Sequence, residues 1–414
     1  MIIIPFFSYN YIDKKKREIS TLKKQIIKLN VEKEKIAAKI GFVPFKYTND
    51  MELDILNNNF FLSKYQTKVF NFTKGFGGKG SSYLDTHNNQ LYLVSANGLL
   101  AKTSLENLEK KDFNMKVIDT NIYTMLDEDL MYEEVAYGIK DILIDDGKIF
   151  ISFTDEIKKD CFNLSILEGK INDNKIEFKY FFKPKNCIKK NVEEYFALLQ
   201  AGGRILNFDN ENLIVSIGEF RSRLLAQDLN SINGKIIKIN KNNKSIEIIS
   251  MGHRNPQGLT IDKDTNLIYS SEHGPKGGDE INTIDTTKTI QNYGWPISSY
   301  GEHYGNEKKE NSELYKIAPL FKSHKDHGFI EPIKHLHVGI SEVTKISNET
   351  YIASSLSAHS LLFFKINKDN SLKVIDNVNV YERVRDMKFF EDRLYLFLED
   401  SPSIGIINFK KFKM

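Results

Sequence analysis

From about residue 48 onward, short apolar runs alternate with polar turns in a pattern that predicts β-strands. A turn rich in Asn, Asp and Gly is followed by large apolar residues, and the run often ends in serine. This unit recurs six times, at residues 91–95, 149–152, 213–216, 267–270, 351–354 and 394–397. Four of the runs follow a second apolar run that ends in an acidic turn, at 142–147, 205–210, 259–264 and 387–392. We therefore expect this part of the chain to be all-β.

The spacing of the units predicts a six-bladed β-propeller. The 303 residues from Leu91 to Leu394 contain five intervals, or about 61 residues per unit, which fits a four-stranded blade with its loops. Blades bury both faces against their neighbours, so the ring must close. We expect a late strand near 406–409 to pair with an early one near 69–72. An insertion around 285–335 predicts a long functional loop. A sandwich or two stacked β domains also fit the pattern.

Residues 13–40 have a helical pattern instead. Apolar residues and one lysine alternate by three and four, at Ile19, Leu22, Ile26, Leu29, Lys33, Ile36 and Ile40. This heptad seam predicts a helix, which could be a short coiled coil that dimerises or holds the propeller off a surface. It could equally be an amphipathic helix packed on its own domain. The pattern divides the chain into an N-terminal segment, 1–47, and a propeller, 48–414.

Composition and charge add one asymmetry. A hydrophobic share of 41% and a charged share of 27% are typical of a globular protein with a core. Ten Lys/Arg and four Asp/Glu between residues 13 and 39 give this arm a charge of +6, so the net +3 leaves about −3 on the remainder. The remainder of the chain therefore lacks the basic surface of a nucleic-acid-binding protein.

The apolar stretch Met1–Tyr11 is shorter than the ~20 residues that a membrane-spanning helix needs. It could be the tail of a signal-anchor that starts upstream, or simply a hydrophobic end. Followed by a basic arm, it predicts possible membrane anchoring or dimerisation through residues 1–40. The only cysteines are Cys161 and Cys187, which could be two unrelated thiols or, in an exported protein, a disulfide.

The densest chemical signal lies between residues 252 and 296. Its three segments are GHRNPQG at 252–258, SEHGPKGGDEIN at 271–282 and NYGWP at 292–296. In the middle segment, a turn that exposes backbone carbonyls is followed directly by Asp279 and Glu280. Carbonyl and carboxylate oxygens are the ligands that Ca²⁺ prefers, although a tight turn with solvated acids explains the segment equally well.

These segments resemble the signature of the glucose/sorbosone dehydrogenase family. Weaker similarity extends from about Asp141 to the C-terminus. The resemblance implies a six-bladed propeller that oxidises an aldose sugar with pyrroloquinoline quinone and Ca²⁺, and a location in the periplasm or cell envelope, with the N-terminus as a possible membrane anchor. Arg254 and Asn255 would then face the quinone, where Arg254 stabilises developing negative charge.

The resemblance also implies the remaining ligands. The carbonyls of Gly274 and Pro275 would bind the Ca²⁺ that polarises the cofactor, and Asp279, Glu280 and the Tyr293 carbonyl would form a second, structural Ca²⁺ site. Arg383-Val384-Arg385-Asp386 matches the family's Arg-x-Arg-Asp. Arg383 and Arg385 suit a cofactor with several carboxylates, because guanidinium groups pair with them bidentately. The alternative is an ordinary ion pair with Glu382 or Asp386.

The sequence also departs from the family. The base histidine should stand four residues before the Arg of a Gly-Arg-Ile segment, and counting back from Arg204 gives Gln200, or Leu199 with a slip of one. Neither accepts a proton near neutral pH. The acid that orients this histidine corresponds to Glu219, the family's lysine to Ser357, and His335 and His337 lie where a pocket-capping aromatic is expected. We therefore expect an impaired sugar dehydrogenase or, alternatively, a non-catalytic Ca²⁺-containing propeller that binds a glycan or a protein at the cell envelope.

Overall fold

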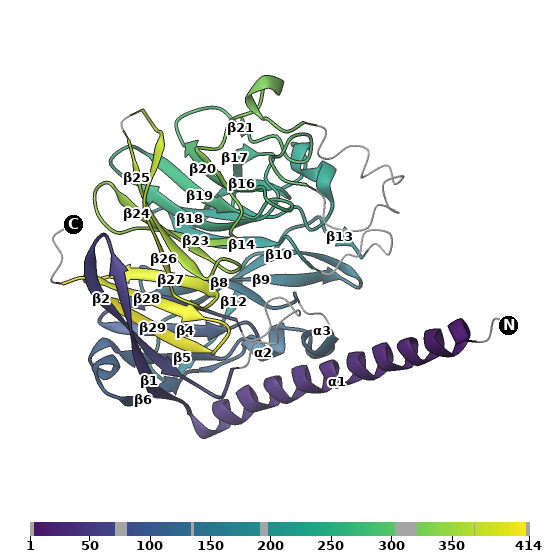
Figure 1. The fold of residues 1–414 in the computed structure, drawn as a ribbon, viewed down its shortest axis with the longest axis vertical. Coiled ribbons are helices and arrows are strands. Elements are labelled where there is room, and N and C mark those ends of the chain that lie inside the picture. The colour runs from purple at the N-terminus through teal and green to yellow at the C-terminus, as the bar shows by residue number, and fades with distance from the viewer. Residues whose placement is uncertain are drawn as a thin grey trace.

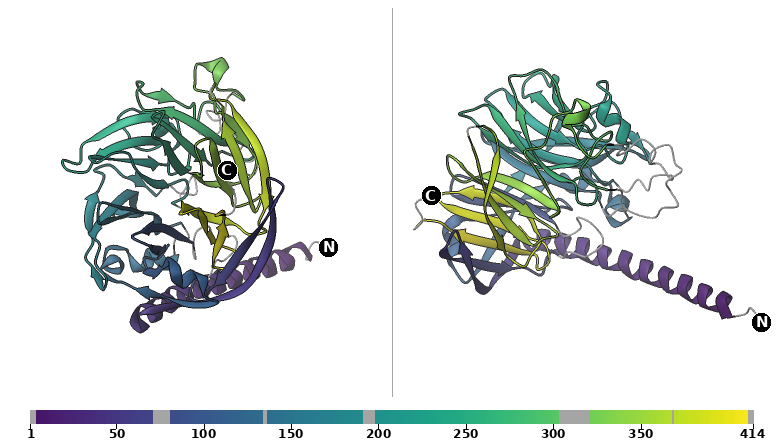
Figure 2. Two further views of the ribbon diagram at one scale, coloured as in Figure 1. Left: turned by 90° about the vertical axis from the view of Figure 1, so that its left-hand side faces the viewer. Right: turned by 45° about the horizontal axis from the view of Figure 1, so that its top comes forward.

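The computed structural model describes residues 4–70, 81–133, 136–190, 198–302, 321–367 and 369–410. Groups of antiparallel strands are arranged around a central axis, and the left view of Figure 2 shows the resulting ring. A long helix extends away from the ring (Figure 1). The fold is therefore mostly β and propeller-like, as the recurring apolar runs predict.

The strands are described here group by group. The first group is β3 (Ser82–His87), β4 (Gln90–Ser95), β5 (Leu100–Ser104) and β6 (Asp112–Val117). The second is β8 (Ile139–Asp145), β9 (Lys148–Lys158), β10 (Cys161–Lys170) and β12 (Lys179–Phe182), and β13 (Ile188–Lys189) also pairs with β10. The third is β14 (Gly202–Asn207), β15 (Asn212–Ile217), β16 (Lys235–Asn240), β17 (Ile246–Met251) and β21 (Gln291–Asn292).

The fourth group is β18 (Pro256–Asp262), β19 (Leu267–Glu272), β20 (Asp279–Asp285) and β22 (Lys334–Leu336). The fifth is β23 (Ile340–Lys345), β24 (Thr350–Ser355), β25 (Ser360–Ile366) and β26 (Leu372–Asn379). The last is β27 (Val384–Phe390), β28 (Arg393–Leu398), β29 (Ser403–Asn408) and β2 (Asn58–Gln66). Strand β1 (Phe42–Ile55) pairs with both β2 and β6 and so joins the last group to the first.

Short elements lie between and within these groups. They are β7 (Asp119–Thr120), β11 (Lys175–Ile176), α2 (Ile122–Met125), α3 (Glu128–Glu133) and the 3-10 helices η1 (Leu105–Glu109), η2 (Arg223–Gln227) and η4 (Lys325–His327). The insertion expected at 285–335 contains β21 and η4, and its residues 303–320 lie outside the described residues.

The first strand of each group faces the axis. Each of these six strands contacts the next, and β27 contacts β3, so the contacts form a closed cycle. All six recurring apolar runs are the second strand of their group, namely β4, β9, β15, β19, β24 and β28. In β15, Leu213 and Val215 pack into one core cluster and Ile214 into the next. Successive side chains of a strand point to opposite faces, so both faces of this sheet are buried.

The strand that closes the ring lies earlier than expected. β29 pairs with β2, with Leu62 opposite Ile407, and not with the segment at 69–72, of which residues 71 and 72 lie outside the described residues. Leu62, Phe60 and Ile407 share a core cluster with Leu394 of β28. Burial of alternate residues of β2 against the last group therefore selects this partner.

Helix α1 (Ile4–Ile40) begins nine residues before the predicted start at residue 13. It ends at Gly41, whose φ of 88° is a left-handed conformation that glycine adopts without strain. Strand β1 then begins at Phe42, ahead of the boundary expected between residues 47 and 48. Ile27, Val31 and Ala37 of α1 are buried, and the helix contacts α3 and β1. Among the described helices, none has the length and apolar character needed to cross a membrane.

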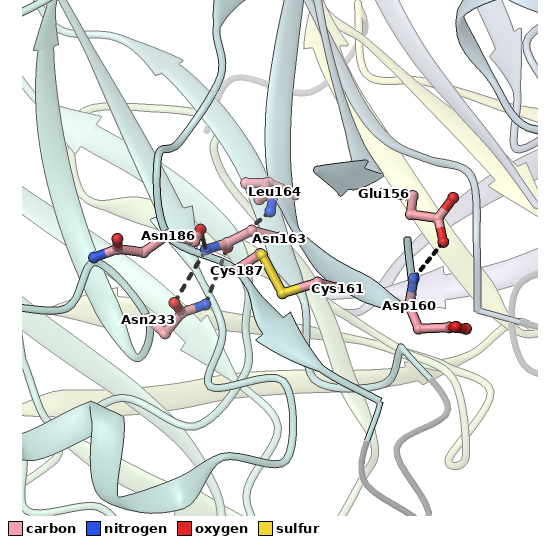
Figure 3. Close-up of a disulfide and its surroundings, with 8 residues drawn as sticks. All are labelled: Glu156, Asp160, Cys161, Asn163, Leu164, Asn186, Cys187 and Asn233. Atoms are coloured by element: carbon pink, nitrogen blue, oxygen red, sulfur yellow. Dashed lines mark hydrogen bonds between the residues drawn. A yellow bond between two sulfur atoms is a disulfide. The ribbon is translucent and has the colours of Figure 1, made fainter. Parts of the chain in front are cut away.

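Cys161 and Cys187 form a disulfide, so of the two alternatives left by the sequence the structure contains the bonded one (Figure 3). The bond ties the start of β10 to the residue before β13. Beside it, the amides of Asn163 and Asn233 donate to each other's carbonyl oxygens over 3.2 and 3.1 Å. This pair links the second group of strands to the third.

Candidate active site

A pocket of about 140 Å³ lies at the end of the ring where the innermost strands begin. Polar side chains from several of these strands and from the loop before β14 line it. They include Tyr83, Lys140, Gln200, Asn255, Gln257, His273 and Arg385, beside Ala136, Leu198, Leu199, Ala201, Gly202 and Leu356. Three residues singled out from the sequence, Gln200, Asn255 and Arg385, therefore share one pocket.

Arg383 and Arg385 pair with the same buried carboxylate. Their Nε atoms donate to the two oxygens of Glu399 over 3.0 and 2.5 Å. Burial alone would raise the pKa of Glu399, but the guanidinium groups of Arg385 and Arg383 overcome this and hold it below its usual value. The partner is therefore Glu399 and not Glu382 or Asp386. Arg385 also lines the pocket, whereas Arg383 donates to the Leu356 carbonyl over 3.3 Å.

Arg254 lies beside the pocket and holds the turn that follows β19. Its Nη1 donates to the carbonyls of His273 and Gly274 over 2.9 and 2.8 Å, and its guanidinium lies 5.4 Å from the Trp295 ring centroid. Asn255 lines the pocket, and its side-chain oxygen accepts from the Gly202 amide over 3.0 Å. This contact fixes the start of β14 against β18.

Gln200 occupies the position at which the resemblance places a base. It has a left-handed φ of 54°, and its side-chain oxygen accepts from Nε of Arg221 over 2.7 Å. Its backbone carbonyl accepts from the Phe220 amide over 3.1 Å, which brings it close to the segment that contains the buried Glu219. Gly218 makes this approach possible, because a Cβ there would lie 1.8 Å from the Gln200 carbonyl oxygen.

The two carbonyls expected to bind Ca²⁺ already have hydrogen-bond donors. The Gly274 carbonyl accepts from Arg254, and the Pro275 carbonyl accepts from the Gly278 amide over 2.8 Å. Within the described residues, no group of three or more His, Cys, Asp and Glu side chains could hold a metal ion. Each carbonyl oxygen therefore has one of its two lone pairs engaged by a hydrogen bond in this conformation.

Asp279 and Glu280 do not come together. They are consecutive residues of β20, so their side chains point to opposite faces of the sheet. One oxygen of Asp279 accepts from the backbone amides of residues 338, 339 and 340 over 3.1, 2.6 and 3.3 Å. Glu280 instead lies 3.1 Å from Nε2 of the buried His324. Tyr293 donates its hydroxyl to the Thr283 carbonyl and stacks on His253.

The electrostatics of the two acids also differ. Burial opposes ionisation of Asp279, but His273 and the backbone amides overcome it and lower the pKa of Asp279. For Glu280, burial dominates and raises the pKa, Glu272 adds to the rise, and His324 opposes it. Each carboxyl thus belongs to its own network.

A second axial cavity, of about 130 Å³, contains a buried charge cluster. Arg204 reaches Asp141 over 2.8 Å, Asp386 over 2.7 Å and Glu342 over 2.5 Å. Burial raises the pKa of Asp141 to about 7; Arg204 opposes this rise and Asp386 adds to it. From the sequence, Arg204 was used only as the reference residue for finding the position of Gln200.

Four residues of the pocket lining were not predicted from the sequence, namely Tyr83, Lys140, Gln257 and His273. Lys140 donates to the Ala136 carbonyl over 2.6 Å. A signal for it exists: directly after the first residue of an innermost strand, Lys140-Asp141-Ile142 and Arg385-Asp386-Met387 both give a cation, an acid and an apolar residue. Burial raises the pKa of Tyr83 to about 12, so its phenol remains a neutral donor.

Neither His335 nor His337 is among the described lining residues, and His335 stacks on Tyr300. Leu356, and not Ser357, lines the pocket.

The fold and the pocket together define a propeller-like protein with a polar, cation-bearing pocket on the axis of its ring, which is a candidate small-molecule site. The sequence profile of the Glucose / Sorbosone dehydrogenase family matches residues 109–407. The chain belongs to this family.

Individual relatives agree with this assignment. The aldose sugar dehydrogenase YliI of Escherichia coli (strain K12) is 37% identical over 121 residues, which are 26% of this chain and 32% of the relative. The quinoprotein glucose dehydrogenase B of Acinetobacter calcoaceticus is 35% identical over 97 residues, or 20% of each chain. The chain thus matches about a third and a fifth of these two proteins.

A crystal structure of a glucose dehydrogenase superposes with a TM-score of 0.62 at 20% identity and covers 79% of this chain and 95% of that one. This similarity shows the fold.

Proposed function

We propose that the chain is a sugar dehydrogenase-like oxidoreductase that binds pyrroloquinoline quinone in the axial pocket and oxidises an aldose. Family membership over residues 109–407 carries this proposal. When bound, the quinone would take up the hydride of the sugar, and the protein would bind and orient both molecules. We further infer that the ring has six blades, because six innermost strands contact one another in a closed cycle.

The chemistry of the lining supports an anionic ligand. Arg385 and Lys140 bring cationic groups to the pocket, and Tyr83 and Gln257 add neutral donors. Guanidinium and ammonium groups pair with the carboxylates that this cofactor bears. Arg254 holds the turn at 273–274 and thereby orients the pocket wall. The proposal does not depend on Ca²⁺, because the residues that line the pocket are argued here to bind the cofactor by hydrogen bonds and charge.

The catalytic hypothesis lacks a general base at position 200, where the chain has Gln200. Its amide cannot accept the hydroxyl proton of a sugar, and loss of a general base typically costs about 10²–10⁴-fold in rate. The second candidate is therefore a propeller that binds a glycan or a protein at the cell envelope without catalysis, and it is consistent with a Gln200 side-chain oxygen that already accepts from Arg221. The disulfide supports export in either case, because such bonds persist in oxidising compartments.

Titration of the full chain with pyrroloquinoline quinone, followed by fluorescence, tests the proposal. We expect Lys140→Met to weaken binding at least tenfold. The matched control is Lys158→Met, which changes an exposed lysine at the C-terminal end of β9 that is not among the lining residues of the pocket and should leave the dissociation constant unchanged. Aldoses with a dye acceptor are then added to the loaded protein. Absence of cofactor binding would exclude the enzymatic function, and binding without turnover would favour the second candidate.

A further inference from the structure

Helix α1 has two apolar faces, and only one of them packs on the ring. Ile27, Val31 and Ala37 are buried together with the polar Asn30 and Glu34. The helix contacts α3 and β1, and the Glu34 carboxylate accepts from Ser95 and Asn97. The other face consists of seven residues, called here the exposed seam: Ile12, Ile19, Leu22, Ile26, Leu29, Ile36 and Ile40. Each of these side chains is 40–61% exposed. The heptad pattern of the sequence therefore does not describe the packing of the helix on its own domain.

The two faces point in different directions. At about 100° per residue, the centre of the exposed seam lies roughly a quarter of a turn from the centre of the buried face. The ring thus leaves the exposed seam open along its whole length. The N-terminal part of the helix, in addition, extends beyond the ring (Figures 1 and 2).

We propose that the exposed seam binds a second copy of this chain in a parallel, two-stranded coiled coil. Ile12, Ile19 and Ile26 occupy consecutive a positions of the heptad, and Leu22 and Leu29 occupy d positions. Isoleucine at a with leucine at d favours parallel dimers over larger assemblies. Lys33 occupies the next a position and is exposed. A single lysine at a costs stability but fixes the register and the number of strands.

Charges beside the seam agree with a parallel, in-register pair. By sequence position, Glu18 lies at g and the lysine at residue 23 at the following e. In parallel coiled coils, g and the next e of the partner face each other, and opposite charges there set orientation. Lys15 interrupts the seam at a d position and pairs with Glu18 over 2.7 Å within its own helix. The part of the seam between the two lysines, Ile19–Leu29, therefore has only apolar residues at its a and d positions and is expected to form the centre of the contact.

The available area is sufficient for a weak dimer. Burial of one leucine or isoleucine side chain contributes about 1.5–3 kcal/mol, which at about 25 cal/mol per Å² corresponds to about 60–120 Å² of apolar surface. The exposed fractions of the seven seam residues add up to nearly four such side chains per copy. Two copies would bury about 450–900 Å² of apolar surface, and because about 60% of an interface is apolar, the total approaches about 1,000 Å². This lies near the lower limit for a specific interface, so dimerisation should depend on concentration.

The geometry leaves room for both rings. The partner helix would lie on the exposed seam, roughly a quarter of a turn from the ring. A two-fold axis along the helix pair then places the two rings on opposite sides of it.

Sedimentation velocity of the full chain over a range of concentrations tests the proposal. We expect a monomer–dimer equilibrium, and we expect Leu22→Glu to raise its dissociation constant at least tenfold. Thr21→Glu is the matched control, because it introduces the same side chain at the adjacent exposed position outside the seam. Circular dichroism checks that both variants remain folded. A wild type that is monomeric at every concentration, or equal loss in both variants, would overturn the proposal.

Cross-linking tests the orientation. Both natural cysteines are bonded to each other, so Leu22→Cys carries one free thiol. A parallel, in-register dimer brings the two introduced thiols together, and oxidation should give a covalent dimer that Thr21→Cys does not give. Absence of this product would contradict the parallel arrangement.

A membrane surface is the other partner that could cover an exposed apolar helix face, and vesicles of phosphatidylglycerol and phosphatidylcholine test it. Vesicle binding lost in Leu22→Glu by a chain that is monomeric in solution would identify a membrane surface and reject the dimer.

Discussion

Arg204 and Asp386 are 182 residues apart in the sequence, and their side chains meet over 2.7 Å on the axis of the ring. The second oxygen of Asp386 accepts from the Leu84 amide over 2.7 Å. Asp386 thus connects the third, the last and the first groups of strands. Asp141 makes a similar link, since it accepts from the Ile205 amide as well as from Arg204. The axial cluster therefore fixes the innermost strands relative to one another, directly beneath the candidate active site.

We predict that Arg204→Met strongly destabilises the protein. One guanidinium pairs with Asp141, Glu342 and Asp386, and its removal leaves three buried carboxyl groups without their cation. Breaking such buried pairs typically costs about 3–5 kcal/mol. Urea unfolding measures the change. Arg393→Met is the control, because its partner Glu109 is largely exposed, and exposed pairs contribute about 0–1 kcal/mol. Equal losses in the two variants would contradict the role given to the cluster.

The same cluster predicts that stability falls as pH rises. Burial raises the pKa of Asp141 to about 7, whereas in the unfolded chain this carboxyl ionises near pH 4. Between these values the folded state binds more protons than the unfolded state, so the free energy of unfolding decreases by up to about 1.4 kcal/mol per pH unit. Burial also raises the pKa of Glu342, which acts in the same direction.

Urea unfolding between pH 4.5 and 7 measures this slope, and Asp141→Asn should make it flatter. Asp285→Asn is the control. Its pKa is lowered by hydrogen bonds from Thr287, so its contribution changes only below about pH 4. A wild-type stability that is constant or rises over this range would show that the axial carboxyl groups stay ionised.

The ring could be predicted from the sequence because its signal is local and repeated. The second strand of each group is buried on both faces, as Leu213 and Ile214 illustrate, and a continuous apolar run is the result. The closing strand has no such signal. Exposed and buried residues are mixed along β2, and its partner β29 lies more than 300 residues away. Only the completed ring selects this pairing.

The site could be predicted in part. Gln200, Asn255 and Arg385 share the pocket because they stand at the start of innermost strands or beside them. The partner of Arg385 was missed because Glu399 follows β28, the neighbouring antiparallel strand, and no motif marks it. Asp279 and Glu280 were expected to act together, but adjacent residues of a strand point to opposite faces. Knowledge of β20 alone would have separated them.

We predict that loss of the disulfide destabilises the protein by about 3–4 kcal/mol. Cys161 and Cys187 are 26 residues apart, and the chain-entropy estimate for a loop of this length gives that value. Thermal unfolding with and without dithiothreitol measures the effect. A variant with Cys161→Ser and Cys187→Ser should match the reduced wild type and show no response to the reductant. Free thiols titrated in the native, oxidised protein would contradict the bond.

We predict that Gln200→His raises aldose turnover if the catalytic hypothesis holds. Histidine tolerates the left-handed backbone found at this position. Arg221, which now donates to Gln200, would lower the pKa of the new imidazole and so keep it neutral and able to accept a proton. Cofactor-loaded protein with a dye acceptor should then gain up to about 10²–10⁴-fold in rate, with activity that rises with pH through the pKa of the imidazole.

Two variants control this experiment. Gln200→Asn keeps an amide and should stay at the wild-type rate. Leu199→His introduces the same imidazole one residue earlier, where it also lines the pocket. A gain in Leu199→His alone would move the base position by one residue. No gain in either histidine variant, with cofactor binding intact, would show that neither position faces the sugar hydroxyl and would favour the non-catalytic propeller.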